Sequence, residues 1–424
     1  MTAILPGALP PAAGGAHADE RLKFNGDGVE FVGLCVRGAL LQLVTFGFYR
    51  FWLATDIRRH LWSHSLVAGE TLEYTGRGRE LLIGFLIALA IIVPVQLVYF
   101  FIGIEAERLQ AFASLPLFIF FVLFGQFALF RARRYRLTRT IWRGVRFWMT
   151  GSGWKYAFRW LGWALVALLT LGLAYPWMRA SLERYKMSNT YYGDLEGEFV
   201  GSPMAFFKRG IWLWLLAFVP AALLLSGMAG TYAVLNWDDL EIVRTESAAV
   251  AEAGSWLSAI GGVAALVIPF VWPFFRALEW RWWADGVRFG ALSLASNIGG
   301  GTFLKIYIKL ILMAILVLTG MSIVIGGLGF MVFYALGIHS PDASIFARLS
   351  RNIPLILSIV VVYLVVLLAV SVVQRFYLTR EMWRAIFTSL TVSHLEAADG
   401  VAARGEAVNA LGEGLADGLD VAGF

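Results

Sequence analysis

Six long apolar stretches constrain the fold of this 424-residue chain more than any other feature of its sequence. Each stretch is long enough to cross about 30 Å of hydrocarbon as a helix. They fall into three consecutive pairs, which predicts three transmembrane hairpins, at about residues 81–104 and 111–130, 210–235 and 256–275, and 303–338 and 355–374. Two further apolar segments, near 34–52 and 157–178, are shorter and interrupted.

The composition explains why these stretches belong in a membrane. Hydrophobic residues make up 59% of the chain and charged residues only 15%, whereas soluble domains have about 45–50% and about 25%. A soluble fold could not bury so much apolar surface, so we expect the lipid bilayer as the main partner. The basic residues flank apolar helices and form no basic domain, so no nucleic-acid partner is expected.

Short sequence repeats run through the chain. Residues 43–52 read LVTFGFYRFW and residues 168–177 read LLTLGLAYPW. In this alignment Thr45, Gly47 and Trp52 match Thr170, Gly172 and Trp177. The exits of two hairpins also match, as RYRLTRTIWR at 134–143 and RFYLTREMWR at 375–384. We therefore predict a repeat-built membrane domain over 22–394, with a first copy at 22–143, a second at 144–285 and a third hairpin at 286–394.

Strand-like residues and a turn of small residues precede each membrane segment, as in LEYTGRG at 72–78 and VRFWMTGSG at 145–153. Such runs predict short β-segments beside the membrane. The predicted fold class is thus an all-α polytopic membrane protein, with three transmembrane hairpins, two short broken helical units and short cytoplasmic β-segments. Residues 1–21 and 395–424 are expected to be a disordered leader and a disordered acidic tail.

The distribution of basic residues predicts the orientation. Five connecting regions hold 27 Lys and Arg, whereas the three hairpin tips hold four. By the positive-inside rule the connecting regions and the C-terminus face the cytoplasm. The two short units then enter and return on one side, with breaks at Gly47 and Gly172, which gives six spans. A reading in which both units cross the membrane, giving eight spans, stays open.

Seven arginines lie where helices leave the predicted bilayer. They could anchor the helices by pairing with lipid phosphate beside tryptophans of the headgroup region. Alternatively, they could form one cytoplasmic vestibule that binds an anionic headgroup through guanidinium groups. These residues are Arg59, Arg139, Arg143, Arg184, Arg281, Arg380 and Arg384.

Metal and catalytic motifs are weak in this sequence. His60 and His64 have a spacing that can place two imidazoles on one helix face. No matching His or Cys pair exists elsewhere, and the second copy has Tyr185 and Asn189 instead. We therefore interpret the two histidines as an interfacial surface pair, and we expect no metal, no cofactor and no enzymatic activity.

Several motifs resemble the YjgN-like family of bacterial inner-membrane proteins, which contain a domain of unknown function. They are FNGDGVEF at 24–31, LVTFGFYRFW at 43–52, the pair Arg58 and Arg59, and LEYTGRG at 72–78. The second copy departs from the pattern at Ala174, which stands where Tyr49 stands. The resemblance covers about 22–390 and implies a polytopic protein of the cytoplasmic membrane, with no established activity.

Two functional hypotheses follow. The first is a transporter- or channel-like protein for a small or amphipathic solute. Its site would lie at the broken units, because broken helices at membrane depth form sites in transporters. The residues of that site would be Thr45, Gly47, Trp52, Thr170, Gly172 and Trp177. The alternative is a non-transporting, lipid-interacting scaffold or envelope factor that uses its basic cytoplasmic face. The oligomeric state stays open.

Overall fold

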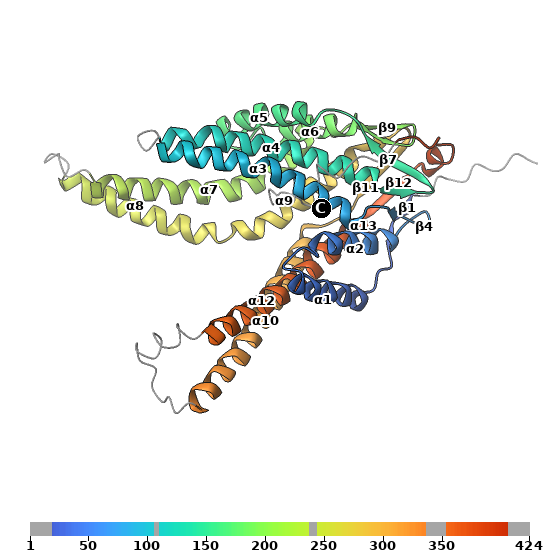
Figure 1. Ribbon diagram of the computed structural model, residues 1–424. Coiled ribbons are helices and arrows are strands. Elements are labelled where there is room, and N and C mark those ends of the chain that lie inside the picture. Colours follow the sequence, from blue (N-terminus) through green and yellow to red (C-terminus); the bar gives the residue numbers. More distant parts are fainter. Residues whose placement is uncertain (1–18, 106–109, 237–243, 336–352, 406–424) are drawn as a thin grey trace, which may run out of the picture.

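The computed structural model describes residues 19–105, 110–236, 244–335 and 353–405 (Figure 1). Most of the predicted leader and tail, residues 1–18 and 406–424, lies outside the described residues. The strands are Glu20–Arg21 (β1), Lys23–Phe24 (β2), Ser65–Val67 (β3), Glu70–Thr71 (β4), Glu73–Tyr74 (β5), Thr140–Trp142 (β6), Val145–Met149 (β7), Thr190–Tyr192 (β8), Leu195–Phe199 (β9), Val287–Phe289 (β10), Leu292–Ser296 (β11) and Leu390–Ser393 (β12).

Nine of these strands form one antiparallel sheet, in the order β1-β12-β11-β10-β9-β8-β7-β6-β5, and β2-β3-β4 form a second. The protein is mostly helical, as predicted, but the all-α class misses this sheet. Each strand has only two to five residues, and its partner is often distant in sequence, as where Val287 pairs with Phe199. Runs this short indicate strands but not which strands pair.

The helices lie between strands that are neighbours in a sheet. They are Gly28–Val44 (α1), Arg50–Ser63 (α2), Gly78–Glu105 (α3), Gln110–Thr138 (α4), Gly153–Leu169 (α5), Tyr175–Met187 (α6), Pro203–Asn236 (α7), Arg244–Ala265 (α8), Ile268–Gly286 (α9), Gly300–Ala335 (α10), Ile353–Gln374 (α12), a π-helical segment Arg375–Glu381, and Met382–Thr388 (α13). Because β5 pairs β6, β7 pairs β8, β9 pairs β10 and β11 pairs β12, each helical excursion starts and ends at the sheet.

Within the described parts of the chain, five helices are long and apolar enough to cross a membrane: Gly78–Phe101, Pro116–Thr138, Pro203–Tyr232, Gly300–Met331 and Val360–Thr388. A sixth span is formed if α8 and α9 count together, with a bend of 48° at the break between them. Many large apolar side chains on these helices are exposed, such as Phe101, Trp212 and Leu316. Lipid is the solvent that such surfaces need, so the protein is embedded in the membrane and crosses it several times.

The two short units are α1/α2 and α5/α6, and each returns to the side from which it starts. The amide of Asn25, before α1, donates to the carbonyl oxygen of His64, after α2, at 3.0 Å. The amide of Thr150, before α5, donates in the same way to Asn189, after α6, at 2.8 Å. Neither unit is among the candidate spans. The geometry agrees with the six-span prediction rather than the eight-span one.

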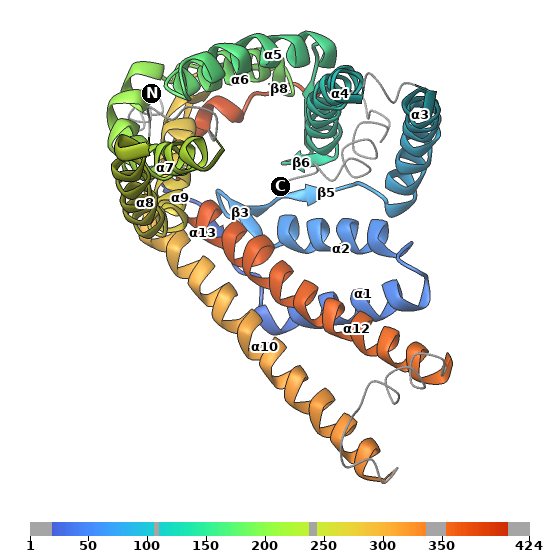
Figure 2. The ribbon, with the colours of Figure 1, turned by 90° about the vertical axis from the view of Figure 1, so that its left-hand side faces the viewer.

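The hairpins spread from the sheet. Helices α3, α4, α5, α7 and α8 run in similar directions away from it, whereas α10 and α12 leave at an angle to them (Figure 1). Viewed along the hairpins, α3 to α9 follow an arc, and α1, α2, α10 and α12 lie across its open side (Figure 2). The sheet thus joins all the helical excursions.

Both ends of the described chain pack on the sheet, which corrects the predicted boundaries of the disordered ends. Strand β1, assigned to the leader, pairs with β12. Residues 395–405, assigned to the tail, begin with a 3-10 turn, Leu395–Ala398. Arg143 Nη1 then donates to Asp399 Oδ1 at 2.7 Å, and Ala402 N donates to Asp194 Oδ1 at 3.0 Å. Low apolar content predicted disorder at both ends. The partners that order these residues are remote in sequence, so they gave no local signal.

Candidate functional site

The turns of the two short units contain the threonines and glycines of the predicted solute site, and Trp52 and Trp177 lie at the starts of α2 and α6. In the first, Thr45 Oγ1 donates to Leu41 O at 2.7 Å and accepts from Tyr49 N at 3.0 Å. In the second, Thr170 Oγ1 donates to Val166 O at 2.8 Å and accepts from Ala174 N at 3.1 Å. Each threonine therefore closes the last turn of one helix and starts the next.

The glycines of these turns have left-handed backbones, with φ of 88° at Gly47 and 89° at Gly172. Glycine adopts this conformation without steric cost, which explains its position at both turns. Trp52 stacks on Tyr49, with ring centroids 6.2 Å apart, and Trp177 packs against Phe207 at 5.4 Å. The threonines and Trp52 thus have structural contacts within their own unit, whereas Trp177 packs against α7.

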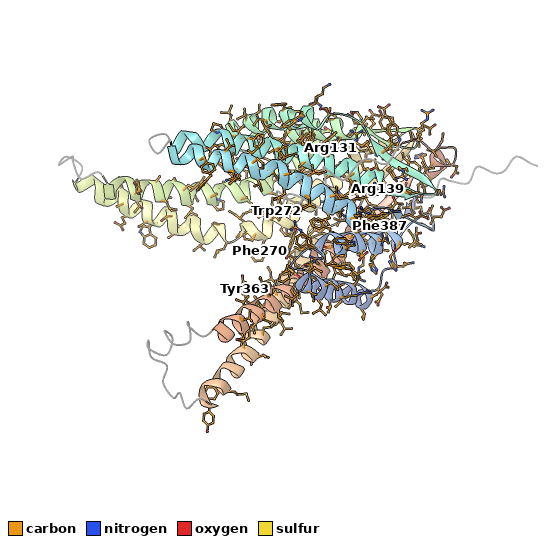
Figure 3. The ribbon with its side chains drawn as sticks, in the orientation of Figure 1. Arg131, Arg139, Phe270, Trp272, Tyr363 and Phe387 are labelled. Carbon is orange, nitrogen blue, oxygen red and sulfur yellow. The ribbon has the colours of Figure 1, made fainter. Side chains whose placement is uncertain are left out.

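Of the three cavities considered below, none joins the two turns. The turn of the second unit borders an apolar cavity of about 290 Å³, at Gly172 and Tyr175. Phe206, Trp214 and Trp272 form part of its aromatic wall, and Trp272 is visible at the start of α9 in Figure 3. The transport hypothesis placed one site between both units. In the structure this apolar cavity borders the turn of the second unit alone.

A buried charged network, which was not predicted from the sequence, lies beside that cavity. Glu183 of α6 and Glu279 of α9 are 1% and 3% exposed. Arg179 bridges them, with Nε 2.7 Å from Glu279 Oε1 and Nη2 3.3 Å from Glu183 Oε1. Lys186 Nζ lies 2.6 Å from Glu183 Oε1, and the Tyr175 hydroxyl donates to Glu279 Oε1 at 2.7 Å. The only sequence signal was an acid within the aromatic run around residue 279.

The network favours the charged form of Glu183. Burial raises the pKa of this carboxyl, but the positive charges of Lys186, Arg179 and Arg133 outweigh this effect and lower the pKa to about 2. Burial lowers the pKa of the Lys186 ammonium to about 8, although Glu183 opposes this shift. Both pKa values are lowered, which favours the charged form of Glu183 but the neutral form of Lys186. The carboxylate has three cationic neighbours, whereas the ammonium has one anion and two guanidinium groups beside it. The network therefore joins the second unit to the second hairpin through buried ions.

The seven predicted headgroup-binding arginines do not converge on one vestibule. Arg139, at the sheet end of α4 (Figure 3), pairs with Glu80 at 2.8 Å, and Arg143 pairs with Asp399. Arg59 pairs with Asp56 at 3.4 Å. Arg184 and Arg281 line none of the three cavities, and two arginines, Arg380 and Arg384, lie together in a basic pocket.

The basic pocket is a cavity of about 770 Å³ at the sheet end of the third hairpin. Five cationic side chains and one carboxylate line it. These are Arg21, Lys305, Lys309, Arg380 and Arg384, with Glu381 as the acid. The two arginines of the hairpin exit were predicted from the sequence, whereas the two lysines and Arg21 were not. The positions 305 and 309 are one helical turn apart, a spacing that could have indicated a shared face.

Two elements fix the cations of the basic pocket. Arg380 is 4% exposed and lies in the π-helical segment, a form often found at functional sites. Its guanidinium pairs with Glu381 and donates to the carbonyl oxygen of Gly26 at 2.6 Å. Lys305 and Lys309 are exposed on the first turns of α10, and among the described residues neither has an ion-pair partner. The pocket therefore offers positive charge to an anion.

A third cavity, of about 580 Å³, lies between α1 and α2 and contains His60 and His64. His60 is only 6% exposed, so the interpretation of the two histidines as a surface pair is wrong for His60. The helix hairpin turns this face of α2 toward α1, which the sequence spacing alone does not reveal. Glu30 of α1 lies beside both histidines, and these three residues could hold a metal ion.

Comparison with known proteins gives one match. A family model described as a bacterial protein of unknown function (DUF898) matches residues 19–418. No curated protein and no solved structure matches the chain. The matched region contains the sheet, both short units, the three hairpins and all three cavities.

Proposed function

The chain belongs to the DUF898 family of bacterial proteins of unknown function, also known as the YjgN-like family, and we propose a function for it from the site. The protein is a non-enzymatic, lipid-interacting protein of the bacterial inner membrane. It binds the anionic headgroup of a lipid in the basic pocket. The excess of positive side chains in that pocket carries the proposal.

The position of the basic pocket suits a headgroup. Lys305 and Lys309 lie at the start of α10, and the exposed apolar surface of that helix begins at once with Ile308, Ile311 and Leu312. A lipid phosphate beside the lysines would leave its acyl chains along this surface. Phosphate accepts hydrogen bonds from ammonium and guanidinium groups, and these bonds are stronger than neutral ones.

The orientation follows from the same charges. The strands at the ends of every hairpin lie in one sheet, and the connecting regions carry most of the Lys and Arg. We assign this side to the cytoplasm under the positive-inside rule. The anionic lipid of the cytoplasmic leaflet would then meet the basic pocket directly, because that leaflet attracts basic residues near its surface.

Native mass spectrometry of the detergent-solubilised protein tests headgroup binding, with phosphatidylglycerol and phosphatidylcholine as probes. The variant replaces Lys305, Lys309 and Arg384 with glutamine. Each cation near a membrane surface contributes about 1 kcal/mol, so this variant should bind phosphatidylglycerol about 100-fold more weakly.

The matched control removes three exposed cations outside the pocket, by replacing Arg184, Lys208 and Arg209 with glutamine. It should bind phosphatidylglycerol like the unmodified protein. Equal binding of both lipids by the unmodified protein, or equal losses in the two triple variants, would show that the pocket does not recognise the headgroup.

The apolar cavity at Gly172 favours a second candidate, which is passage of an amphipathic solute. Its aromatic lining and its position at the turn of a broken helical unit support this function. Proteoliposomes can be assayed for uptake of an amphipathic dye such as rhodamine 6G. If the protein transports the dye, uptake should exceed that of empty liposomes, and the variant Ile211→Trp, which fills the cavity, should reduce it. Uptake equal to that of empty liposomes contradicts transport of this dye class.

A further inference from the structure

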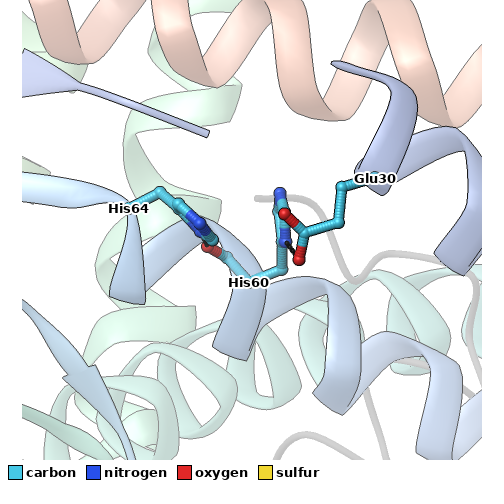
Figure 4. A group of neighbouring side chains, drawn as sticks. All are labelled: Glu30, His60 and His64. Atoms are coloured by element: carbon cyan, nitrogen blue, oxygen red, sulfur yellow. Dashed lines mark hydrogen bonds and ion pairs between the residues drawn. The ribbon is translucent and has the colours of Figure 1, made fainter. Parts of the chain in front are cut away.

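Three side chains with metal-binding atoms meet between the two helices of the first unit. Glu30 lies in the first turn of α1, and His60 and His64 lie at the end of α2. Figure 4 shows them facing one another across the gap between these helices. Their ligand atoms all lie within 4.8 Å of one another. The backbone bond from Asn25 to His64 and the pairing of β2 with β3 hold the two helix ends together.

The separations come close to those of a coordinated ion. Two ligands of a tetrahedral Zn²⁺ site lie about 3.3 Å apart, given Zn–N and Zn–O bonds of about 2.0–2.1 Å. His60 Nδ1 lies 3.5 Å from Glu30 Oε1. The rings of His60 and His64 have centroids 4.3 Å apart. Small rotations of the exposed Glu30 side chain and of the His64 ring would bring all three ligands to one ion.

The hydrogen bonds of His64 fit a ligand role. Its Nδ1 lies 2.7 Å from the carbonyl oxygen of His60. A carbonyl only accepts, so Nδ1 carries the proton and donates, which leaves the Nε2 lone pair for a ligand. Metal-binding histidines almost always fix their tautomer by such a bond from the other ring nitrogen.

His60 is the buried member of the cluster. Its side chain is 4% exposed, and its buried Nε2 has no hydrogen-bond partner. Its Nδ1 contact with Glu30 is longer than a normal hydrogen bond. Nδ1 is therefore the ring nitrogen that would bind an ion beside Glu30, and Nε2 would carry the proton of the neutral imidazole.

We propose that Glu30, His60 and His64 bind one divalent first-row transition-metal ion, such as Zn²⁺. Imidazole nitrogens favour these ions over Mg²⁺ and Ca²⁺, which prefer oxygen ligands. Two histidines and one carboxylate leave at least one coordination position open. That position adjoins the cavity between α1 and α2, where Asp56 and Ser63 are further lining residues. The ion joins α1 to α2 at the sheet end of the first unit.

Metal titration of the full-length protein tests this site. The protein is purified without a polyhistidine tag, stripped with EDTA and titrated with Zn²⁺, and with Co²⁺ for its visible absorption. We expect one Zn²⁺ per chain and a Co²⁺ spectrum with nitrogen ligation. Glu30→Gln and His64→Gln should each weaken Zn²⁺ binding at least about tenfold, because each removes one ligand while keeping a similar shape.

The control is His394→Asn, which removes an exposed imidazole outside the cluster. It should bind Zn²⁺ like the unmodified protein, and its backbone, at φ 59°, suits asparagine. Elution volume and helical circular dichroism show that each variant is folded. Absence of saturable Zn²⁺ binding by the folded unmodified protein, or unchanged affinity in both ligand variants, would overturn the proposal.

Discussion

Arg380 donates from Nη2 to the carbonyl oxygen of Gly26 at 2.6 Å, across a separation of 354 residues. The bond ties the exit of the third hairpin to the start of the first unit. The same guanidinium lines the basic pocket, and Gly26 lies four residues before the metal-site residue Glu30. The two proposed sites therefore share one structural connection, and changes at Arg380 should affect both.

Replacement of Arg380 should destabilise the protein. Arg380→Ala leaves Glu381 without its buried partner and Gly26 O without a donor, and removal of one partner of a buried pair costs about 3–5 kcal/mol. Arg380→Lys keeps the charge but loses the fork that reaches both acceptors, so an intermediate loss is expected. Chemical unfolding in detergent, followed by tryptophan fluorescence, measures the stability of both variants.

The control is Arg384→Ala, at a side chain 53% exposed, which should change stability by no more than about 0.5 kcal/mol. Equal losses at the two positions would contradict this account.

Glu183 makes stability dependent on pH in the acid range. Its pKa is about 2 in the folded protein against an ordinary value of 4.5. The unfolded chain therefore binds a proton more readily than the folded one between these values. The stabilisation is fully present above about pH 4.5 and is lost as the pH falls toward 2. Thermal unfolding at several pH values between 2 and 7 measures this loss.

Glu183→Gln should remove that acid-dependent contribution and lower stability near pH 7, because Lys186 and Arg179 keep their buried charges without this partner. Glu196→Gln is the control, since Glu196 is an exposed carboxylate on β9. It should leave the pH profile unchanged. A Glu183→Gln profile with the same acid slope as the unmodified protein would assign the slope to other groups.

The left-handed turn of the first unit requires glycine. An added Cβ at Gly47 would meet nothing within 4 Å, so any cost of Gly47→Ala comes from its φ of 88°. We expect destabilisation by about 1 kcal/mol. Gly162 lies inside α5 with similarly open space, and Gly162→Ala should stabilise by about 0.5–1 kcal/mol through helix propensity. Melting temperatures in one detergent should therefore shift in opposite directions. A shift in the same direction for both variants would argue against a backbone cause.

The return of the second unit predicts the accessibility of its two ends. Ser152 precedes α5 and Ser188 follows α6. In a background with Cys35→Ala, the single variants Ser152→Cys and Ser188→Cys should both react with an impermeant maleimide only after the cytoplasmic side is opened. Phe101→Cys, near the far end of α3, should not share this pattern. Labelling of the two serine positions from opposite sides would mean that α5 and α6 cross the membrane.

The sequence by itself determined the membrane class, the hairpin order and the positions of the helices. The apolar stretches predicted α3, α4, α7, α10 and α12 because hydrocarbon length and backbone hydrogen bonding leave a single chain few alternatives. The sequence also indicated the turns at Gly47 and Gly172, since a left-handed residue between apolar helices is a local feature.

Only the tertiary structure decided which distant residues meet. Strands of two to five residues gain their stability from partners as remote as Glu20 and Val392, so their pairing has no local signal. The buried ions Glu183 and Glu279, the cations of the basic pocket, and Glu30 with its two histidines come from different helices. These residues are far apart in sequence because long helices connect them. They are in contact because the strands at the ends of those helices pair in the sheet and bring the helices side by side.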